Sequence, residues 1–386
     1  MRSFLRRKGA LHYNPLPVAL ILLCCLLLVS ACSSSLRQDT VKKSPLPTNM
    51  SRADRLTAYL ATLQQQQAIN GAVLVAQGDT IVLQQGFGQA NFPQHIPNTI
   101  RTRFRIGSNT KQFTAMAVLL LQEQGKLHLT DPICWYLDSC PQAWAPITIQ
   151  QALTHSAGIP NYTDFADFPR LIGTAVTVPD LIQRFIQQPL LFTPGTQWSY
   201  SNSGYVVIGA IIEKVAKMPY RDFIQQAIFT PLGMKDSGYD TNTPPLPLHA
   251  TGYLTPTQLP VVFDMSEVYA AGALYSTVAD LYRWDRALMN GTLVSASAQA
   301  SMFAIQIPCP TGGCLQSMDK GYGLGWFIAE EQGHRYNYHW GRIDGFVAAN
   351  GFAPQDGSIV IVLSNLETTD AFGISTQLLR IMVGTP

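Results

Sequence analysis

Strand-like apolar segments occur near both ends of the chain, and helical patterns fill the stretch between them. Near the N-terminus, residues 72–76 and 80–83 flank the turn residues Gly78 and Asp79, which predicts a β-hairpin. In the last third, strands are expected at 324–329, 336–340, 346–353 and 358–363. One layer architecture accommodates this order if the C-terminal strands complete the sheet that the hairpin begins. The pattern therefore predicts a single α/β body with a helical insertion at about 126–265.

Helical spacing of apolar residues predicts helices at 52–67, 109–124, 180–188, 204–217, 219–229 and 371–383. The segment 109–124 is apolar nearly all round and is followed by Gly125, so we expect a buried helix rather than a surface one. Residues 240–260 contain five prolines and are expected to be irregular.

The composition excludes several classes of protein. Hydrophobic residues make up 47% of the 386 residues, which is too many for a disordered chain. The net charge is only +2, and no basic stripe is present, so we expect no nucleic-acid partner.

The first 31 residues have the pattern of a secretory signal. Basic residues at the start precede an unbroken apolar run from Val18 to Val29, which is too short to cross a bilayer. The run ends in Val-Ser-Ala-Cys32, which resembles a bacterial lipobox, and this resemblance implies that Cys32 carries lipid after cleavage. The alternative is an uncleaved anchor helix. Both readings predict a protein outside the cytoplasm, on the periplasmic face of a bacterial membrane, with 32–50 as linker and 51–383 as the folded domain.

Four cysteines of the domain form two close pairs, Cys134 with Cys140 and Cys309 with Cys314. Exported proteins meet oxidising conditions, so we expect two disulfides. A zinc site is the rival interpretation, but the pairs lack C-x₂-C spacing and no histidine cluster accompanies them.

The segment Ser108-Asn-Thr-Lys111 opens the predicted buried helix. Residues three apart share a helix face, so the lysine amine can lie beside the serine hydroxyl. Burial disfavours the charged form of lysine, and a neutral amine beside a serine is a base beside a nucleophile. The alternative is a serine N-cap followed by a lysine that reaches to solvent. A second S-x-x-K, Ser317 to Lys320, runs into a glycine-rich strand start and is expected to be a loop.

Other catalytic signatures are missing from the sequence. It contains neither the G-x-S-x-G of α/β-hydrolases nor the H-E-x-x-H of metalloproteases. Its glycine runs lack the strand–turn–helix context of a dinucleotide site.

Two further motifs follow the first in order, Tyr200-Ser-Asn202 before a predicted helix and His339-Trp340-Gly341 on a late strand. The set resembles the serine β-lactamase and penicillin-binding-protein-like family, and most closely the class C branch with its esterase and D-aminopeptidase relatives. The resemblance extends over residues 55–383. It is also carried by the stretches Leu153–Gly158, Pro231–Met234, Ala271–Thr277 and Leu363–Asn365. It implies an antiparallel sheet flanked by helices, with a helical subdomain.

The resemblance also implies roles for individual residues. Ser108 would be the acylated nucleophile, and Lys111 and Tyr200 would share the proton transfers, with the identity of the base left open. Asn202 would hold the lysine and bind the substrate amide. The N–H groups of Ser108 and of Arg342, which follows Gly341, would form the oxyanion hole. No metal or organic cofactor is implied, and His155, Asp280 and Trp284 are interpreted as structural.

The third motif departs from the Lys-Thr-Gly of β-lactamases and many transpeptidases. His339 replaces the lysine and is largely neutral at pH 7 by its ordinary pKa, and Trp340 replaces the threonine. Both changes weaken recognition of an anionic β-lactam, although Arg342 could partly restore a positive charge. We therefore expect a hydrolase of D-amino-acid peptides or esters, with a small-molecule or peptidoglycan-like substrate. The alternatives are a class C-type β-lactamase, a penicillin-binding D,D-carboxypeptidase, a non-catalytic sensor of penicillin or cell-wall fragments, and a purely structural envelope lipoprotein. The sequence leaves the oligomeric state open.

Overall fold

The computed structural model describes residues 50–242 and 248–384, and contacts place these residues in one unit. The predicted leader, Cys32 and nearly all of the linker lie outside the described residues. No helix among the described residues has the length and apolar character that a membrane crossing requires.

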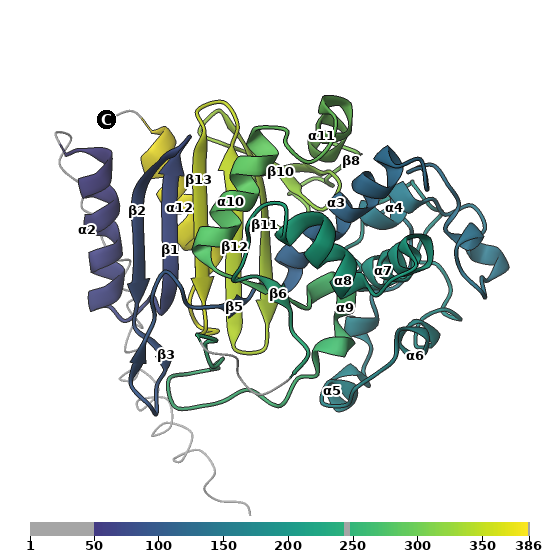
Figure 1. The fold of residues 1–386 in the computed structure, drawn as a ribbon, viewed down its shortest axis with the longest axis horizontal. Helices are drawn as coiled ribbons and strands as arrows, with labels where there is room; N and C mark the ends of the chain where they lie inside the picture. Colours follow the sequence, from purple (N-terminus) through teal and green to yellow (C-terminus); the bar gives the residue numbers. More distant parts are fainter. Residues whose placement is uncertain (1–49, 243–247, 385–386) are drawn as a thin grey trace, which may run out of the picture. The chain divides into compact units, whose positions relative to one another are not determined.

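An antiparallel sheet of eight strands forms the centre of this unit, in the order β2-β1-β13-β12-β11-β10-β9-β8 (Figure 1). The N-terminal hairpin and the C-terminal strands thus share one sheet, as the sequence predicts. The strands are β1 Gly71–Gln77, β2 Thr80–Phe87, β8 Ile307–Pro308, β9 Asp319–Tyr322, β10 Phe327–Glu331, β11 His334–Ile343, β12 Phe346–Ala353 and β13 Ser358–Ser364. Two small sheets contain β3 Gln89–Asn91 with β4 Ile96–Pro97, and β5 Phe104–Arg105 with β7 Leu274–Ser276 and β6 Gly238–Tyr239.

Helices cover both faces of the sheet, which explains why β1 and β13 read as nearly continuous apolar runs. Side chains alternate along β13: Val360 and Val362 pack with α2 (Arg52–Gln65) and α12 (Ala371–Val383) on one face. Ile359 and Ile361 belong to the core on the other face, which includes residues of α3 (Thr110–Glu123) and α10 (Val278–Met289).

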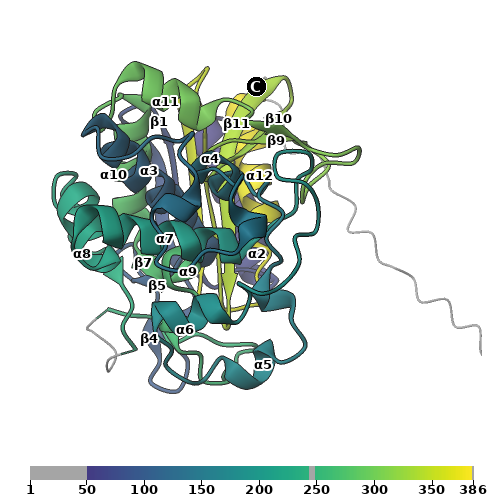
Figure 2. The same cartoon turned by 90° about the vertical axis from the view of Figure 1, so that its right-hand side faces the viewer.

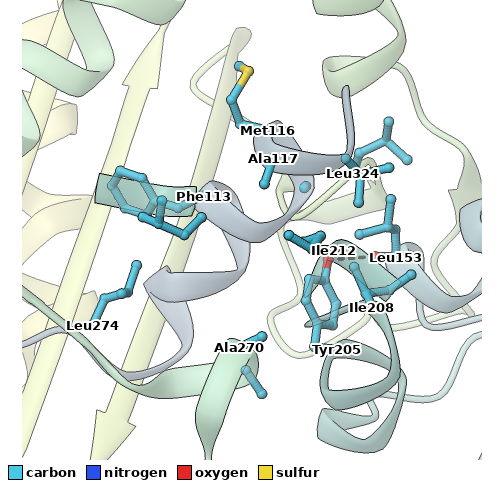
Figure 3. Packing of buried hydrophobic residues seen from close by; sticks show 14 of the residues in the cluster. Phe113, Met116, Ala117, Leu153, Tyr205, Ile208, Ile212, Ala270, Leu274 and Leu324 are labelled. Carbon is cyan, nitrogen blue, oxygen red and sulfur yellow. Dashed lines mark hydrogen bonds between the residues drawn. The ribbon is translucent and has the colours of Figure 1, made fainter. Parts of the chain in front are cut away.

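The remaining helices form a second part beside the sheet (Figures 1 and 2). They are α4 Ile149–Leu153, α5 Phe168–Leu171, α6 Val178–Gln183, α7 Asn202–Ala216, α8 Tyr220–Ile224 and α9 Tyr269–Gly272, with α11 Ala296–Phe303 near β8. Helix α3 lies between this part and the sheet, and its apolar side chains are buried from several directions (Figure 3). The prediction of a buried helix at 109–124 is confirmed.

Three predicted elements differ clearly in their bounds. The strand expected from residue 324 begins at Phe327, because Gly325 has a φ of +80° and forms a turn there. The helix expected at 180–188 ends at Gln183, and the helix expected at 219–229 becomes a π-helical turn after Ile224.

Candidate active site

Ser108 lies in a single turn, Gly107–Asn109, that leads from β5 into α3. This turn packs against β11, which β10 covers only as far as Tyr338, so the segment from His339 onward has a free edge. The approach is close: a Cβ atom on Gly341 would lie 2.1 Å from Ile106 O and 2.7 Å from Ser108 N. Only glycine fits at position 341, and its absence of a side chain is what allows the serine to lie beside the strand.

The Lys111 amino group is fully buried and lies among three oxygen atoms. Its Nζ is 3.1 Å from Ser108 Oγ, 2.7 Å from Asn202 Oδ1 and 2.8 Å from Ala271 O. Burial lowers the pKa of Lys111 well below its ordinary value, which favours the neutral amine. A neutral amine has two N–H donors and one lone pair. Because the Asn202 and Ala271 oxygens can only accept, they take both donors, and the lone pair is left for the Ser108 hydroxyl.

Tyr200 approaches the same hydroxyl from another side. Its O–H donates to Ser108 Oγ over 2.8 Å, and burial raises its pKa above the ordinary value, so the phenol keeps its proton. The Lys111 Nζ lies 4.8 Å from the centre of the Tyr200 ring. Ser108 therefore has a base on one side and a proton donor on the other.

Asn202, at the start of α7, connects Lys111 to a loop that the sequence does not single out. Its side-chain nitrogen donates to Thr163 Oγ1 over 3.1 Å, and its backbone N–H donates to Asn161 Oδ1 over 3.0 Å. Asn161 and Thr163 line the same cavity as Ser108. No motif marks these two residues, because their contacts with Asn202 span about forty positions in the chain.

The backbone N–H groups of Ser108 and Arg342 are the two that are placed for a developing negative charge. Ile343 and Phe346 flank a two-residue turn and so form a hydrogen-bonded pair of the β11–β12 ladder. Hydrogen-bonded and non-hydrogen-bonded residue pairs alternate along the ladder, so Arg342 belongs to a non-hydrogen-bonded pair. Its N–H therefore points away from β12, to the edge of β11 where the Ser108 turn lies. A Cβ on Gly107 would lie 3.0 Å from Arg342 N, which shows how close the two segments are.

His339 is buried and neutral. Its Nδ1 donates to the Trp340 carbonyl over 2.7 Å, and its Nε2 lies 3.0 Å from the Tyr322 hydroxyl, which assigns the proton to Nδ1. Burial and the nearby Lys111 lower the pKa of His339 to about 3. The guanidinium of Arg342 pairs with Glu367, with Arg342 Nε 2.8 Å from Oε1. Glu367 therefore balances the charge that Arg342 was expected to supply.

A cavity of about 700 Å³ opens beside these groups. Among the predicted site residues, Ser108, Tyr200, Asn202, His339 and Arg342 line it, and so does Trp340, whereas Lys111 and Gly341 lie behind its wall. Its lining contains three carboxyl groups, from Asp164, Asp344 and Glu367, against the one guanidinium of Arg342. Burial and the neighbouring Glu367 raise the pKa of Asp344.

The three residues interpreted as structural all pack in the interior. His155 is buried at a left-handed φ of +60°, and its Nδ1 accepts from Ser201 N over 3.1 Å. Its ring lies 4.3 Å from that of Tyr200 and so supports the tyrosine. Asp280 accepts from Asp236 N and Ser237 Oγ, and the Trp284 ring stacks on Phe113 at 4.3 Å.

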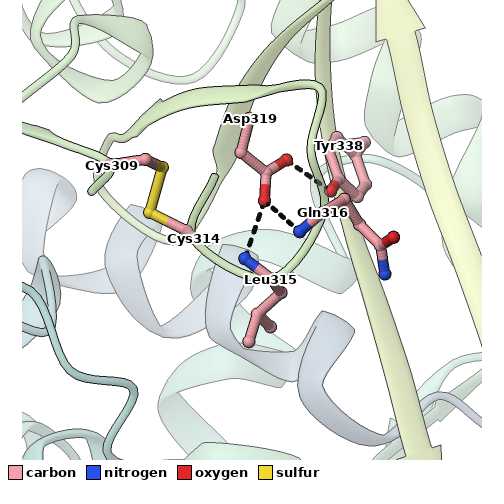
Figure 4. Close-up of a disulfide and its surroundings, with 6 residues drawn as sticks. All are labelled: Cys309, Cys314, Leu315, Gln316, Asp319 and Tyr338. Carbon is pink, nitrogen blue, oxygen red and sulfur yellow. Dashed lines mark hydrogen bonds between the residues drawn. A yellow bond between two sulfur atoms is a disulfide. The ribbon is translucent and has the colours of Figure 1, made fainter. Parts of the chain in front are cut away.

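Both expected disulfides are present, Cys134–Cys140 and Cys309–Cys314. The second closes a loop beside the cavity, and Leu315, which follows it, lines the cavity wall. Asp319 accepts from the N–H groups of Leu315 and Gln316 over 3.0 and 2.8 Å, and from Tyr338 Oη over 2.6 Å (Figure 4). These bonds anchor the loop to the sheet. Within residues 50–242 and 248–384, no group of three or more His, Cys, Asp or Glu side chains is arranged to hold a metal ion.

Comparisons with known proteins identify the family. The beta-lactamase family model matches residues 56–381. The putative penicillin-binding protein PbpX of Bacillus subtilis is 31% identical over 341 residues, which cover 87% of this chain and 80% of that protein. Penicillin-binding protein 4* of the same organism is 30% identical, over 71% of this chain and 62% of its own length. The crystal structure of D-amino acid amidase from Ochrobactrum anthropi SV3 has the same fold, with a TM-score of 0.75 at 24% identity over 86% of this chain and 99% of that one. The chain belongs to the beta-lactamase family of serine hydrolases and penicillin-binding protein homologues.

Proposed function

We propose that this serine hydrolase cleaves an amide or ester bond of a D-amino-acid peptide or ester through an acyl-enzyme on Ser108. One observation carries the proposal: the Ser108 hydroxyl lies 3.1 Å from the Lys111 amine and 2.8 Å from the Tyr200 hydroxyl, at the wall of a cavity large enough for a small substrate.

In the first step, Lys111 Nζ removes the proton of Ser108 as Oγ attacks the substrate carbonyl carbon. The carbonyl oxygen becomes an oxyanion, which the N–H groups of Ser108 and Arg342 stabilise. The proton then moves from Lys111 to the leaving nitrogen or oxygen, with Tyr200 as the relay beside Oγ. The bond to the leaving group breaks, and an ester on Ser108 remains.

In the second step, a water molecule attacks the ester carbonyl and gives its proton to the Lys111–Tyr200 pair. The same two N–H groups hold the second oxyanion. Collapse of this intermediate returns the proton to Ser108 Oγ and releases the carboxylic acid.

The charges of the cavity favour this substrate class over one with a carboxylate beside the scissile bond. His339 is neutral and Arg342 is paired with Glu367, so neither offers a free positive charge to a β-lactam or to a C-terminal D-alanine. Asp164 and Asp344 add negative charge to the lining. The shared fold of a D-amino acid amidase is consistent with a substrate of this kind.

A penicillin-binding D,D-carboxypeptidase or a class C-type β-lactamase is the second candidate. The observation that favours it is the 31% identity to PbpX, a putative penicillin-binding protein. A non-catalytic sensor would use the same serine and would be acylated without turnover.

For the location, we propose a lipid anchor at Cys32 on the periplasmic face of a bacterial membrane. The apolar leader that ends at Cys32 supports it, and the two disulfides fit an oxidising compartment. Replacement Cys32→Ala should move the protein from the detergent phase to the aqueous phase in a partition experiment. Equal partition of both forms would contradict the anchor.

Intact-protein mass spectrometry tests the catalytic proposal. The protein is exposed in parallel to a D-alanine ester, a D-Ala-D-Ala peptide and nitrocefin, and both acylation and its decay are followed. We expect a transient acyl adduct with the D-alanine ester that is absent in Ser108→Ala and present in Ser317→Ala, which alters the exposed second S-x-x-K. Adduct formation in Ser108→Ala would refute the assignment. A stable adduct with nitrocefin alone would favour the sensor.

A further inference from the structure

A second cavity, of about 750 Å³, lies next to the active site, where α4 and the segment Gly195–Trp198 face the edge strand β8. It contains none of the residues assigned to catalysis. Its size is within the range of about 300–1,000 Å³ that is usual for small-ligand sites, and it lies at the junction of the helical part and the sheet, where such sites are common.

The lining is polar and uncharged. Hydroxyl and amide side chains dominate it, from Thr130, Thr148, Thr154, Gln150, Gln197 and Gln306, and none of the described residues that line it is Asp, Glu, Lys or Arg. A site of this kind offers both donors and acceptors but no charge to attract or neutralise an ion. The half-buried Trp198 adds an aromatic ring, which can pack against the apolar face of a sugar.

Several lining groups are held in place by hydrogen bonds with one another. Gln150 Nε2 donates to Gln306 Oε1 over 2.7 Å, which links α4 to the residue before β8. The hydroxyls of Thr154 and Ser156 lie 2.9 Å apart, and Gly195 N donates to Ser156 O over 2.8 Å. A ligand would therefore bind to a largely preformed site and order few side chains.

The adjacent sheet edge is unsuited to a peptide. A peptide usually binds by adding a strand and pairing with free N–H and C=O groups of an edge. Here the edge strand β8 has two residues, and the prolines Pro308 and Pro310 have no N–H to donate. The chemistry of the lining thus favours a ligand recognised through hydroxyl groups.

The second cavity is connected to the catalytic residues by shared segments. Trp198 lines it, and its ring lies 6.4 Å from that of Tyr200 and 6.1 Å from that of His155. Cys309 lines it as well, whereas Leu315, just beyond the partner Cys314, lines the active-site cavity. The same two chain segments, Trp198–Tyr200 and Cys309–Leu315, thus contribute residues to the linings of both cavities.

We propose that the second cavity binds a neutral saccharide, so that a substrate with a sugar part is held by this part while its acyl part lies at Ser108. The position of the acyl part at Ser108 rests on the proposed function, whereas binding of the saccharide needs no catalysis, so the two proposals can fail separately.

The test uses the Ser108→Ala protein and the neutral disaccharide N,N′-diacetylchitobiose, with binding followed by ligand-observed saturation-transfer NMR and by tryptophan fluorescence. We expect saturable binding that becomes about five-fold weaker in Gln197→Ala, the change expected for one lost hydrogen bond. Trp198→Leu should weaken binding further. Gln187→Ala, an exposed glutamine outside the cavity lining, is the matched control and should bind as the parent does.

Thermal unfolding of each variant shows whether a loss of binding comes from misfolding. Gln197→Ala changes a solvent-exposed side chain and is therefore the variant expected to perturb the fold least. Absence of binding by the parent, equal affinity of the parent, Gln197→Ala and Trp198→Leu, or tighter binding of a neutral D-alanine peptide than of the disaccharide would each overturn the proposal.

Discussion

Three oxygen atoms surround the Lys111 amine, and their chemistry decides which protonation state is useful. The Asn202 and Ala271 oxygens each accept one N–H of Lys111, so a third proton on Nζ would point at Ser108. The Lys111 amine could then not accept the serine proton as a base. The raised pKa of Tyr200 keeps the phenol protonated, which leaves Lys111 as the group that can accept a proton. In the proposed mechanism this arrangement makes Lys111 the base and Tyr200 the proton donor, roles that the motifs alone leave open.

Replacement Lys111→Met should reduce the acylation rate by about 10²–10⁴-fold, the usual contribution of a positioned base. In the wild type, acylation should rise as pH increases through the lowered pKa of Lys111, because only the amine without its extra proton can accept from Ser108. Stopped-flow acylation across pH measures both effects. Lys214→Met, at an exposed lysine, is the control. A wild-type acylation rate that decreases as pH increases through this range would contradict the role of Lys111.

Asp285 is a buried carboxyl group that catalysis does not use. Burial raises its pKa well above the ordinary value, and Asn350 Nδ2, at 3.0 Å, is its hydrogen-bond donor. The folded state therefore binds a proton at this site more tightly than the unfolded state does. It follows that the stability contribution of Asp285 falls as pH rises from the ordinary carboxyl pKa through the raised one.

Asp285→Asn should therefore increase the free energy of unfolding at pH 7 relative to wild type. The free energy of unfolding of the variant should also decrease less than that of wild type as pH rises above about 4. Denaturant unfolding at several pH values measures this change. The matched variant Asp138→Asn, at an exposed carboxyl group, should have little effect. An Asp285→Asn protein that is less stable than wild type at pH 7 but equally stable in acid would show that the carboxyl is charged in the fold.

At the residue scale, motif spacing was sufficient for side chains that are close in sequence or belong to a known pattern. Ser108 and Lys111 share one helical turn, and Tyr200 and Asn202 stand beside a predicted helix start. Glu367 could not be identified in this way, because it meets Arg342 only through the pairing of β11, β12 and β13. The pairing of Arg342 is a tertiary property that no local pattern contains.

The contact between β11 and the Ser108 turn is the element-scale feature that assembles the site. In the proposed mechanism each segment contributes an oxyanion N–H, and the two segments can approach this closely only because position 341 has no side chain. Gly341→Ala should push the strand away from Ile106 and Ser108 and widen the oxyanion site.

We expect Gly341→Ala to lose about 10²–10³-fold in kcat, as for the loss of one oxyanion donor, while far-ultraviolet circular dichroism stays close to wild type. The KM should change less than kcat, because the oxyanion forms only in the reaction. Full activity in this variant would show that Arg342 N does not take part.

Element bounds were predicted best where one local signal dominated. The final helix at 371–383 agrees with α12, because its apolar spacing runs unbroken to the end. The sequence predicts a strand from 324 because the run Gly-Leu-Gly-Trp has strand-like composition, but the strand begins at Phe327 because Gly325 adopts a positive φ. Backbone conformation at a glycine depends on its neighbours in space, and here Lys111 O lies 2.7 Å from where a Cβ would stand.

At the scale of the whole molecule, the order of strand-like and helical segments predicts the shared sheet and the family resemblance implies the flanking helices, but neither predicts the strand order. Apolar runs in β1 and β13 indicate strands buried on both faces, which requires helices on both sides. Which strands are neighbours depends on how distant segments pack, and β13 beside β1 joins residues nearly three hundred positions apart.

The charges of the active-site cavity lead to a prediction about substrate choice. Asp164, Asp344 and Glu367 line it against Arg342 alone, so a substrate with a free ammonium group should be preferred over one with a carboxylate. We expect kcat/KM for D-alanine p-nitroanilide to exceed that for its N-succinyl derivative, and the ratio to shrink at high salt. Asp344→Asn should reduce the ratio by about three- to ten-fold, as for the loss of about 1 kcal/mol of partly buried charge interaction.

The pH dependence of this ratio has a definite sign. Burial and Glu367 raise the pKa of Asp344, so its negative charge, and with it the preference for the ammonium substrate, grows as pH rises through that pKa. Asp344→Asn should remove this growth, whereas Asp138→Asn, at an exposed carboxyl group outside the cavity, should keep it. Steady-state kinetics of both substrates over a pH series measures the effect. A ratio that favours the succinylated substrate at every pH would show that the cavity binds an anion, and would favour the D,D-carboxypeptidase over the proposed function.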